Sequence, residues 1–366
     1  MASRPPPERT PRRKAIRTRL RRLRDPEWIR QKLGPRFVDT YRGAKLAVAY
    51  AWNPDPPLAV DPPMVPAQEA HGLSDDEVVL GFVEGGEARA YPWGFVPHVV
   101  NDTVAGRAVA VVLCPMCSSG TAFDRTVDGR PLTFQAQVDR TRGLVRPRRG
   151  ERRYVYNGTA AIQDRETGSV WSPFLALAFR GSLKGRTLQP LPLWQMEWRA
   201  WRDLHPDTWA LDVNGMPRVR KLGIEHEHID DAFRSTVSRW DERLPHNALV
   251  LGVVTPGGQR AYRVEDLVAG SGVVNDEVEG TPVVILSHPA RGNYGAAAFS
   301  RETGGRVLTF DPTPGGAVDR ETGSRWTLEG RAVEGPLAGT QLEFAASHVG
   351  MWYVWAAHFP DLHIAT

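Results

Sequence analysis

The chain of 366 residues is poor in cysteine and has no long apolar run. Two cysteines are too few for a disulfide framework, so any chemistry they perform belongs to one local site. No segment approaches the ~18 consecutive apolar residues that a membrane span needs. No basic start leads into an apolar stretch, so the sequence predicts no signal peptide. We therefore expect a cytoplasmic protein without a transmembrane segment.

Familiar catalytic signatures are also missing. The sequence has no glycine-rich GxGxxG turn after a predicted strand, no P-loop, no HExxH pair and no GxSxG nucleophile turn. Nucleotide hydrolysis, zinc proteolysis and α/β-hydrolase chemistry are therefore without support. No recognisable nucleic-acid-binding module is present, so that class of function depends on basic segments alone.

Positive charge is concentrated at the N-terminal end. Residues 1–40 hold 13 Lys and Arg against 4 Asp and Glu, and residues 9–24 contain no acidic residue. Ile16, Leu20 and Leu23 are spaced to share one helix face, which indicates a basic amphipathic arm. Such an arm suits an anionic partner or surface, and a solvated tail is the alternative. We assign residues 1–60 to this arm and a proline-rich lead-in.

Glycine and proline are abundant, at 35 and 30 residues, which favours turns and short strands over long helices. The clearest helix is predicted over Trp194–Leu204, where the tryptophans form one stripe. Short β-branched or alternating runs, bounded by turn residues, predict strands at Val78–Glu84, Ala88–Tyr91, Ala108–Leu113, Thr121–Arg125 and Leu132–Gln137. The sequence thus predicts a mainly β (α+β) fold.

An internal repeat organises the rest of the chain. VLGFVEGGEARAYP from Val79 returns from Val250 as VLGVVTPGGQRAYR, and DRETGSVW from Asp164 returns from Asp319 as DRETGSRW. We infer a tandem duplication that gives two similar lobes, each a β-rich unit with one C-terminal tryptophan-rich helix. The first repeat spans residues 61–215, a linker spans 216–244, and a degenerate second repeat spans 245–366.

The first repeat also carries an insertion at residues 138–153, which holds seven arginines. The insertion interrupts no strand pattern and is therefore predicted to be a loop. It is a second place where an anionic partner can bind, and an exposed basic hairpin is the alternative.

The two copies differ at a cysteine motif. The first copy has Cys114-Pro-Met-Cys117 at the end of a predicted strand, where the second copy has Ser-His-Pro-Ala from Ser287. The first copy also has His98 where the second has Gly272. Two residues between thiols let both sulfurs face one point, and thiolates bind Zn²⁺ or Cu(I) well. We predict a mononuclear copper or zinc site with Cys114, Cys117 and His98 as ligands and an open fourth position.

Asp102, Asp124 and Arg125 are candidate catalytic residues that would orient ligands or substrate around this metal. The predicted function is metal binding, extended to a metal-dependent enzyme acting on a small molecule if a substrate pocket adjoins the metal. Three other hypotheses stay open. They are a non-catalytic metal-handling protein, a thiol–disulfide oxidoreductase using the CxxC pair, and an assembly or surface-binding protein acting through the basic arm. Nothing in the sequence indicates the oligomeric state.

Several short motifs in the first repeat match a pattern known from other proteins. They are Arg89-Ala90-Tyr91-Pro92, His98 before Asn101-Asp102, Cys114-Pro115-Met116-Cys117, Phe123-Asp124-Arg125, Tyr156-Asn157, the DRETGS run from Asp164, Trp171 and Trp201. These motifs resemble the family catalogued as domain of unknown function 3179 (DUF3179). The resemblance extends over residues 60–212 and, in degenerate form, 245–366. It implies a shared fold and a site at the cysteine motif, and it implies no reaction.

Overall fold

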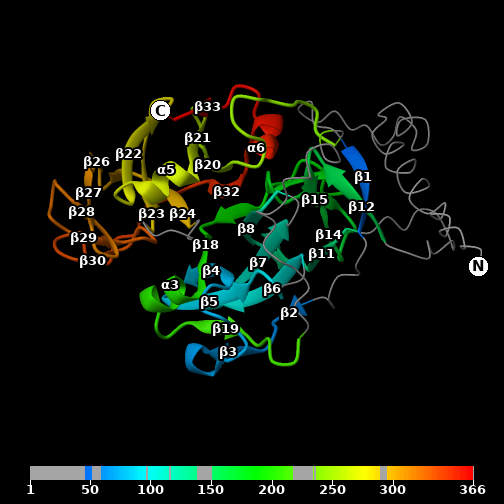
Figure 1. The fold of residues 1–366 in the computed structure, drawn as a ribbon, viewed down its shortest axis with the longest axis horizontal. Helices are drawn as coiled ribbons and strands as arrows, with labels where there is room; N and C mark the ends of the chain where they lie inside the picture. The colour runs from blue at the N-terminus through cyan, green and yellow to red at the C-terminus, as the bar shows by residue number, and fades with distance from the viewer. Residues whose placement is uncertain are drawn as a thin grey trace, which may run out of the picture.

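Figure 1 shows the computed structural model of the chain. The structure describes residues 46–51, 59–95, 98–114, 117–137, 151–216, 234, 236–288 and 295–365. The predicted basic arm at 9–24, most of the predicted loop at 138–153 and most of the predicted linker lie outside these residues. Residues 46–216 are called the first half below, and residues 236–365 the second half.

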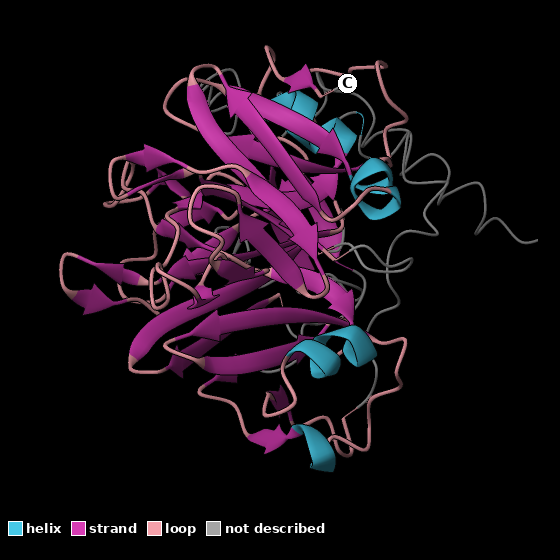
Figure 2. Ribbon diagram, turned by 90° about the vertical axis from the view of Figure 1, so that its left-hand side faces the viewer, coloured by secondary structure: helices cyan, strands magenta, loops and turns pink. Residues whose placement is uncertain are grey.

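The described chain is mainly β, as the sequence predicted, and its helices are short (Figure 2). In the first half, one sheet has the order β2 (Ala59–Val60), β6 (Val99–Val104), β7 (Arg107–Cys114), β8 (Ser119–Asp124), β17 (Gln189–Leu191). A second has the order β3 (Met64–Pro66), β19 (Trp209–Leu211), β5 (Glu87–Pro92), β4 (Val78–Glu84), β18 (Trp194–Glu197). A third has the order β11 (Phe134–Ala136), β14 (Ile162–Asp164), β15 (Val170–Ser172), β16 (Leu177–Arg180).

Smaller elements complete the first half. They are the sheet β1 (Leu46–Ala51), β12 (Glu151–Tyr156), β13 (Thr159–Ala160), the hairpin β9 (Thr126–Val127), β10 (Arg130–Pro131), and the helices η3 (Ala67–Glu69) and α3 (Trp198–Leu204). The strands β1 and β2 come from the segment assigned to the arm and lead-in, and they pair with β12 and β6 of the first half.

The second half has sheets of similar strand order. They are β22 (Val273–Val278), β23 (Thr281–Ser287), β24 (Ala296–Ser300), β31 (Phe344–Ala345); β32 (Ser347–Met351), β20 (Leu249–Val254), β21 (Gln259–Arg263), β33 (His363–Ile364); and β27 (Phe310–Thr313), β28 (Gly316–Asp319), β29 (Arg325–Thr327), β30 (Ala332–Glu334). The hairpin β25 (Glu302–Thr303), β26 (Arg306–Val307) and the helices α5 (Val264–Ala269) and α6 (Trp352–His358) complete it.

A tryptophan packed on a glycine fixes one helix in each half. Helix α3 follows β18 directly and α6 follows β32 directly, so each helix folds back over its own sheet. A Cβ atom added to Gly81 would lie 2.3 Å from ring carbons of Trp201, and one added to Gly252 would lie 2.4 Å from those of Trp355. Only glycine lets an indole ring approach the strand this closely.

The repeated DRETGS runs form the same turn. Asp164 accepts a hydrogen bond from the Nε1–H of Trp171 at 2.8 Å, and Asp319 accepts one from that of Trp326 at 2.8 Å. Both indole nitrogens would otherwise be buried without partners, which is costly. These residues therefore serve the fold.

The repeated Asn-Asp motifs connect sheets. The amide of Asn101 exchanges two hydrogen bonds with the backbone of Phe134, at 2.8 and 2.7 Å. Asn275 makes the same pair with Phe310, at 2.8 and 2.9 Å. Strand β6 is thereby tied to β11, and β22 to β27.

The two halves pack through reciprocal contacts. Strand β32 of the second half lies against β8 of the first, and β18 of the first half lies against β24 of the second. One apolar core therefore joins Trp194, Trp198 and Trp201 to Phe299 and Trp326. Neither half has all of its apolar surface covered without the other.

The predicted helix over Trp194–Leu204 is wrong in its first turn. Residues Trp194–Glu197 form β18, which pairs antiparallel with β4 in the register Trp194↔Gly81, and the helix starts at Trp198. Sheet pairing outweighs the helical spacing of the tryptophans, because β18 covers the open edge of β4. The predicted strand β4 is confirmed at both ends.

The last residues of the predicted loop at 138–153 also differ from the prediction. Residues 151–153 belong to β12, where Glu151 pairs with Ala51 and Arg153 with Ala49. Strand β1 provides backbone donors and acceptors that β12 satisfies, so β12 extends into the arginine-rich segment.

None of the helices in the described ranges is long and apolar enough to cross a membrane.

The fit between Gly252 and Trp355 predicts a large effect for one methyl group. Gly252→Ala is expected to lower the free energy of unfolding by about 1–3 kcal/mol, because the indole or the strand has to shift. Gly350→Ala is the matched control, since its Cβ would lie 3.4 Å from the Nε1 of the same Trp355. Urea unfolding should show a lowered midpoint for Gly252→Ala only. Equal midpoints for the two variants would contradict this packing.

Candidate functional site

The two cysteines lie at a hairpin between β7 and β8. Cys114 ends β7 and pairs with Ser119 at the start of β8, and Cys117 lies in the connecting turn. Ser118 has a φ of +49°, which reverses the chain within the turn. Neither cysteine is in a disulfide, and both are buried. The hairpin therefore positions two thiols in the protein interior.

Hydrogen-bond donors face both sulfur atoms. The backbone N–H of Ala160 lies 3.5 Å from Sγ of Cys114, and the hydroxyl of Ser119 lies 3.1 Å from Sγ of Cys117. The thiol of Cys117 also donates to the backbone carbonyl of Cys114 at 3.9 Å. Donors that point at sulfur stabilise a thiolate and tune metal–thiolate centres. The hairpin therefore holds two thiols, and each of them has a polar partner.

The second half covers this dithiol. The backbone N–H of Met351 donates to the carbonyl of Cys117 at 2.9 Å, and the hydroxyl of Tyr353 donates to the carbonyl of Gly158 at 3.3 Å. Both cysteines belong to one apolar cluster with the residues of α6. The predicted site of the first repeat is therefore completed by the second half.

Burial controls the charge of these groups. Desolvation raises the pKa of Cys117 well above its ordinary value, and the hydrogen bond with Cys114 adds to this rise, while Ser119 opposes it. Burial likewise raises the pKa of Tyr353, and the nearby Cys117 and Cys114 raise it further. The Cys117 thiol is therefore protonated at neutral pH unless a cation replaces its proton.

His98 is near the cysteines in the backbone, but the predicted three-ligand set is not assembled. The carbonyl of His98 accepts the N–H of Leu113, the residue before Cys114. Over the residues the structure describes, no group of three or more His, Cys, Asp or Glu side chains is placed to hold a metal ion. Met116, which the motif places between the cysteines, lies outside those residues.

The candidate catalytic residues lie at the other end of β7. Asp102 and Asp124 both pair with Val109, which is five residues from Cys114, or ~17 Å along the strand. Arg125 follows Asp124 directly. The structure does not bring these three residues to the dithiol.

Their side chains have partners in the fold. Hydrogen bonds from Thr126 and Arg107 outweigh burial and lower the pKa of Asp124. Asp102 also borders an open depression of about 560 Å³. Their hydrogen bonds run from Tyr91 Oη to Asp102 at 2.6 Å, from Arg107 Nε to Asp124 at 3.1 Å, and from Arg125 Nη1 to the carbonyl of Leu132 at 3.0 Å.

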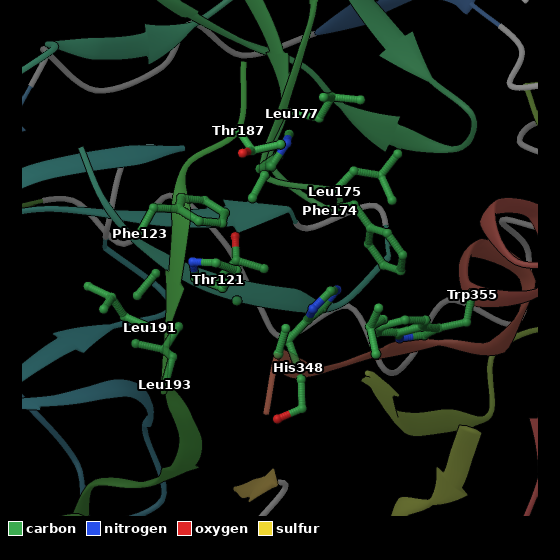
Figure 3. A pocket seen from close by; sticks show the side chains of 18 of the residues that line it. Thr121, Phe123, Phe174, Leu175, Leu177, Thr187, Leu191, Leu193, His348 and Trp355 are labelled. Atoms are coloured by element: carbon green, nitrogen blue, oxygen red, sulfur yellow. The ribbon is translucent and has the colours of Figure 1, made fainter. Parts of the chain in front are cut away.

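A cavity of about 180 Å³ lies beside the cysteine hairpin, and Figure 3 shows its lining. Gly120, the residue after Ser119, is part of its lining. The lining also includes Phe174 of the first half and His348 and Trp355 of the second half. The ring of His348 lies 4.5 Å from that of Phe174 and 4.5 Å from that of Trp355. Its Nε2 is shielded from solvent and has no hydrogen-bond partner among the described residues.

Reasoning from sequence missed His348, Tyr353 and His358, all from the second half. These three residues differ from those at the matching positions of the first half, which are Trp194, Arg199 and Leu204. The signal was present in the sequence, but only the fold shows that these side chains lie against the first half.

The fold and the site define a mainly β protein with a buried dithiol beside an apolar cavity. A family model described as a protein of unknown function (DUF3179) matches residues 56–362, nearly the whole chain. The chain belongs to the DUF3179 family, as its motifs predicted. The comparisons with curated proteins and with solved structures each found no match.

The buried His358 predicts a pH dependence of stability. Burial lowers its pKa to about 4, although its hydrogen bond to the carbonyl of Val354 opposes the shift. Its pKa is about 6.5 in the unfolded chain, so the unfolded chain binds a proton that the folded chain does not bind. The contribution of His358 to stability is therefore complete above pH ~6.5 and is lost toward pH ~4, by up to about 1.4 kcal/mol per pH unit.

The test is urea unfolding of wild type and His358→Leu between these pH values. The variant carries the residue found at the matching Leu204 and should show a shallower fall in stability with falling pH. Replacing the exposed His363 with Leu is the control and should leave the slope at the wild-type value. Identical slopes for wild type and His358→Leu would rule out a buried neutral imidazole at this position.

Proposed function

We propose that the protein binds a soft metal ion, with Cys114 and Cys117 as thiolate ligands and Cu(I) as the preferred ion. The observation that carries the proposal is the presence of two buried thiols in one hairpin, each with a hydrogen-bonding group within 3.5 Å of its sulfur. A buried thiolate is costly without compensation, and a cation provides it. Metal binding would therefore displace the thiol protons that burial otherwise retains.

The donor set favours copper over zinc. Zinc in proteins is almost always bound by four ligands, or by three and an open position. Thiolate and thioether ligands select Cu(I), and the Cys-Pro-Met-Cys motif contains both kinds of sulfur. His98 remains the predicted third ligand for either metal, and its backbone lies beside the end of β7.

The cavity next to the dithiol favours an enzyme acting on a small molecule over a metal-handling protein. Gly120 lines the cavity, and the residue before it, Ser119, hydrogen-bonds to Cys117. Thiol–disulfide exchange is less well supported, because attack on a disulfide needs an accessible thiolate, and burial raises the pKa of Cys117. An assembly or surface-binding role through residues 9–24 and the 138–153 segment, and a cytoplasmic location, stay predictions.

We also propose that the two halves arose by tandem duplication and form two similar lobes. The similar strand orders support this, as do the matched turns at Asp164 and Asp319. The two halves then diverged, because the dithiol lies in the first half and the residues that cover it come from the second half.

Anaerobic titration of the reduced protein tests the metal. Wild type should bind about one Cu(I) per chain. Binding is measured by competition with a chromogenic Cu(I) chelator and by the ultraviolet absorption of the thiolate-to-copper charge transfer. Cys114→Ser/Cys117→Ser should lose that binding entirely, because no soft ligand pair remains. Ser119→Ala should bind more weakly, since one donor to sulfur is removed.

Two further variants locate the remaining ligand. His98→Ala and Met116→Leu each remove one candidate, and a large loss of affinity in either identifies a third ligand. Zn²⁺ titrated in parallel decides between the metals, and tighter binding of zinc than of Cu(I) overturns the copper assignment. Absence of binding of both ions by folded wild type, checked by circular dichroism, overturns the proposed function.

A further inference from the structure

The cavity beside the dithiol is built by both halves. Strand β8 and the segment around Phe174 form one wall, and His348, Trp355 and Phe359 of the second half form the other. In Figure 3 the ring of His348 points from β32 toward Phe174. The site therefore exists only where the two halves meet.

The volume and lining of the cavity define a class of ligand. An engineered apolar cavity of ~150 Å³ binds benzene, so about 180 Å³ suits one six-membered ring with a small substituent. Among the residues that line it there is no Asp, Glu, Lys or Arg. A charged ligand would be desolvated here without a counter-charge, so the ligand is uncharged. The rings of Phe123, Phe174, Trp355 and Phe359 favour an aromatic ring.

Two buried side-chain nitrogens of the lining lack a partner among the described residues, Nε2 of His348 and Nε1 of Trp355, and of the two only the imidazole nitrogen can accept a hydrogen bond. The Nε2 of His348 is shielded from solvent and lacks a partner among the described side chains and backbone. Burial and the charge of the neighbouring His358 lower the pKa of His348 to about 3, so its imidazole is neutral at pH 7. The Nε2 of a neutral imidazole is a donor in one tautomer and an acceptor in the other. A hydroxyl group on the ligand pairs with it in either case.

The first half provides an internal comparison. In the second half His348 pairs with Gly252, the glycine under Trp355. In the first half Trp194 pairs in the same way with Gly81, the glycine under Trp201. At this equivalent position the first half has a large indole, fully buried in the core. The second half has the smaller imidazole and a cavity beside it. The cavity is therefore a specific difference between two otherwise similar surroundings.

From these observations we infer that the cavity between β8, Phe174 and α6 binds a small uncharged aromatic molecule with a hydroxyl group, which hydrogen-bonds to Nε2 of His348. The phenols are the simplest members of this class. The inference does not depend on the proposed metal, because none of its steps uses the thiols. If both proposals hold, the ligand lies next to the dithiol.

Calorimetric titration with phenol and with toluene tests this inference, since the two probes differ chiefly in the hydroxyl group. Wild type should bind both, and phenol about five- to tenfold more tightly, the value of one hydrogen bond. His348→Phe keeps an aromatic ring and removes Nε2, so it should bind the two probes with similar affinity. His348→Trp introduces the residue of the first half, should fill the cavity and should bind neither.

The controls separate this site from the metal and from misfolding. Cys114→Ser/Cys117→Ser should bind phenol as wild type does, so failure of the metal proposal leaves this result unchanged. Thermal unfolding should show that His348→Trp stays folded, and His348→Ala serves as the second variant if it does not. Absence of phenol binding by wild type, or unchanged phenol affinity in folded His348→Phe, overturns the inference.

Discussion

The packing of a tryptophan directly on a glycine is the constraint on which the rest of the structure depends. Trp355 on Gly252 fixes helix α6, and the strand that leads into α6 is β32. With α6 in place, Met351 bonds to the carbonyl of Cys117. The same strand carries His348 to the cavity. One close contact thus sets the positions of the groups that cover the dithiol and line the cavity, because α6 follows β32 without a loop between them.

The two halves use this arrangement for different purposes. In the first half the position opposite the glycine holds Trp194, which fills the core. In the second half His348 holds that position and leaves space with an unpartnered nitrogen. Nε1 of Trp194 also lacks a partner among the described residues, so the difference between the halves is the cavity beside His348, which gives a ligand room to reach its nitrogen. The first arrangement fills the core, and the second leaves room for the proposed ligand.

The sequence predicts much of the fold. The strand Val78–Glu84 is predicted with its observed ends, because a short run of β-branched and other apolar residues and a following Gly-Gly turn mark it locally. The first turn of the Trp194–Leu204 helix was not, because pairing with β4 is a long-range effect. For the site, the sequence indicated the cysteine pair but placed Asp102 and Asp124 beside it, whereas the register of the strands puts them at the other end of β7.

The sequence by itself determined the family, the β-rich class, the close spacing of the two thiols and the turns that recur in each half. These properties depend on residues that are near one another in the chain, so local chemistry is enough to define them. Only the tertiary structure decided that the thiols are buried, that Tyr353 and His348 of the second half complete their surroundings, and that a cavity opens between the halves. Burial and desolvation depend on contacts between residues more than a hundred positions apart, and no local pattern encodes such contacts.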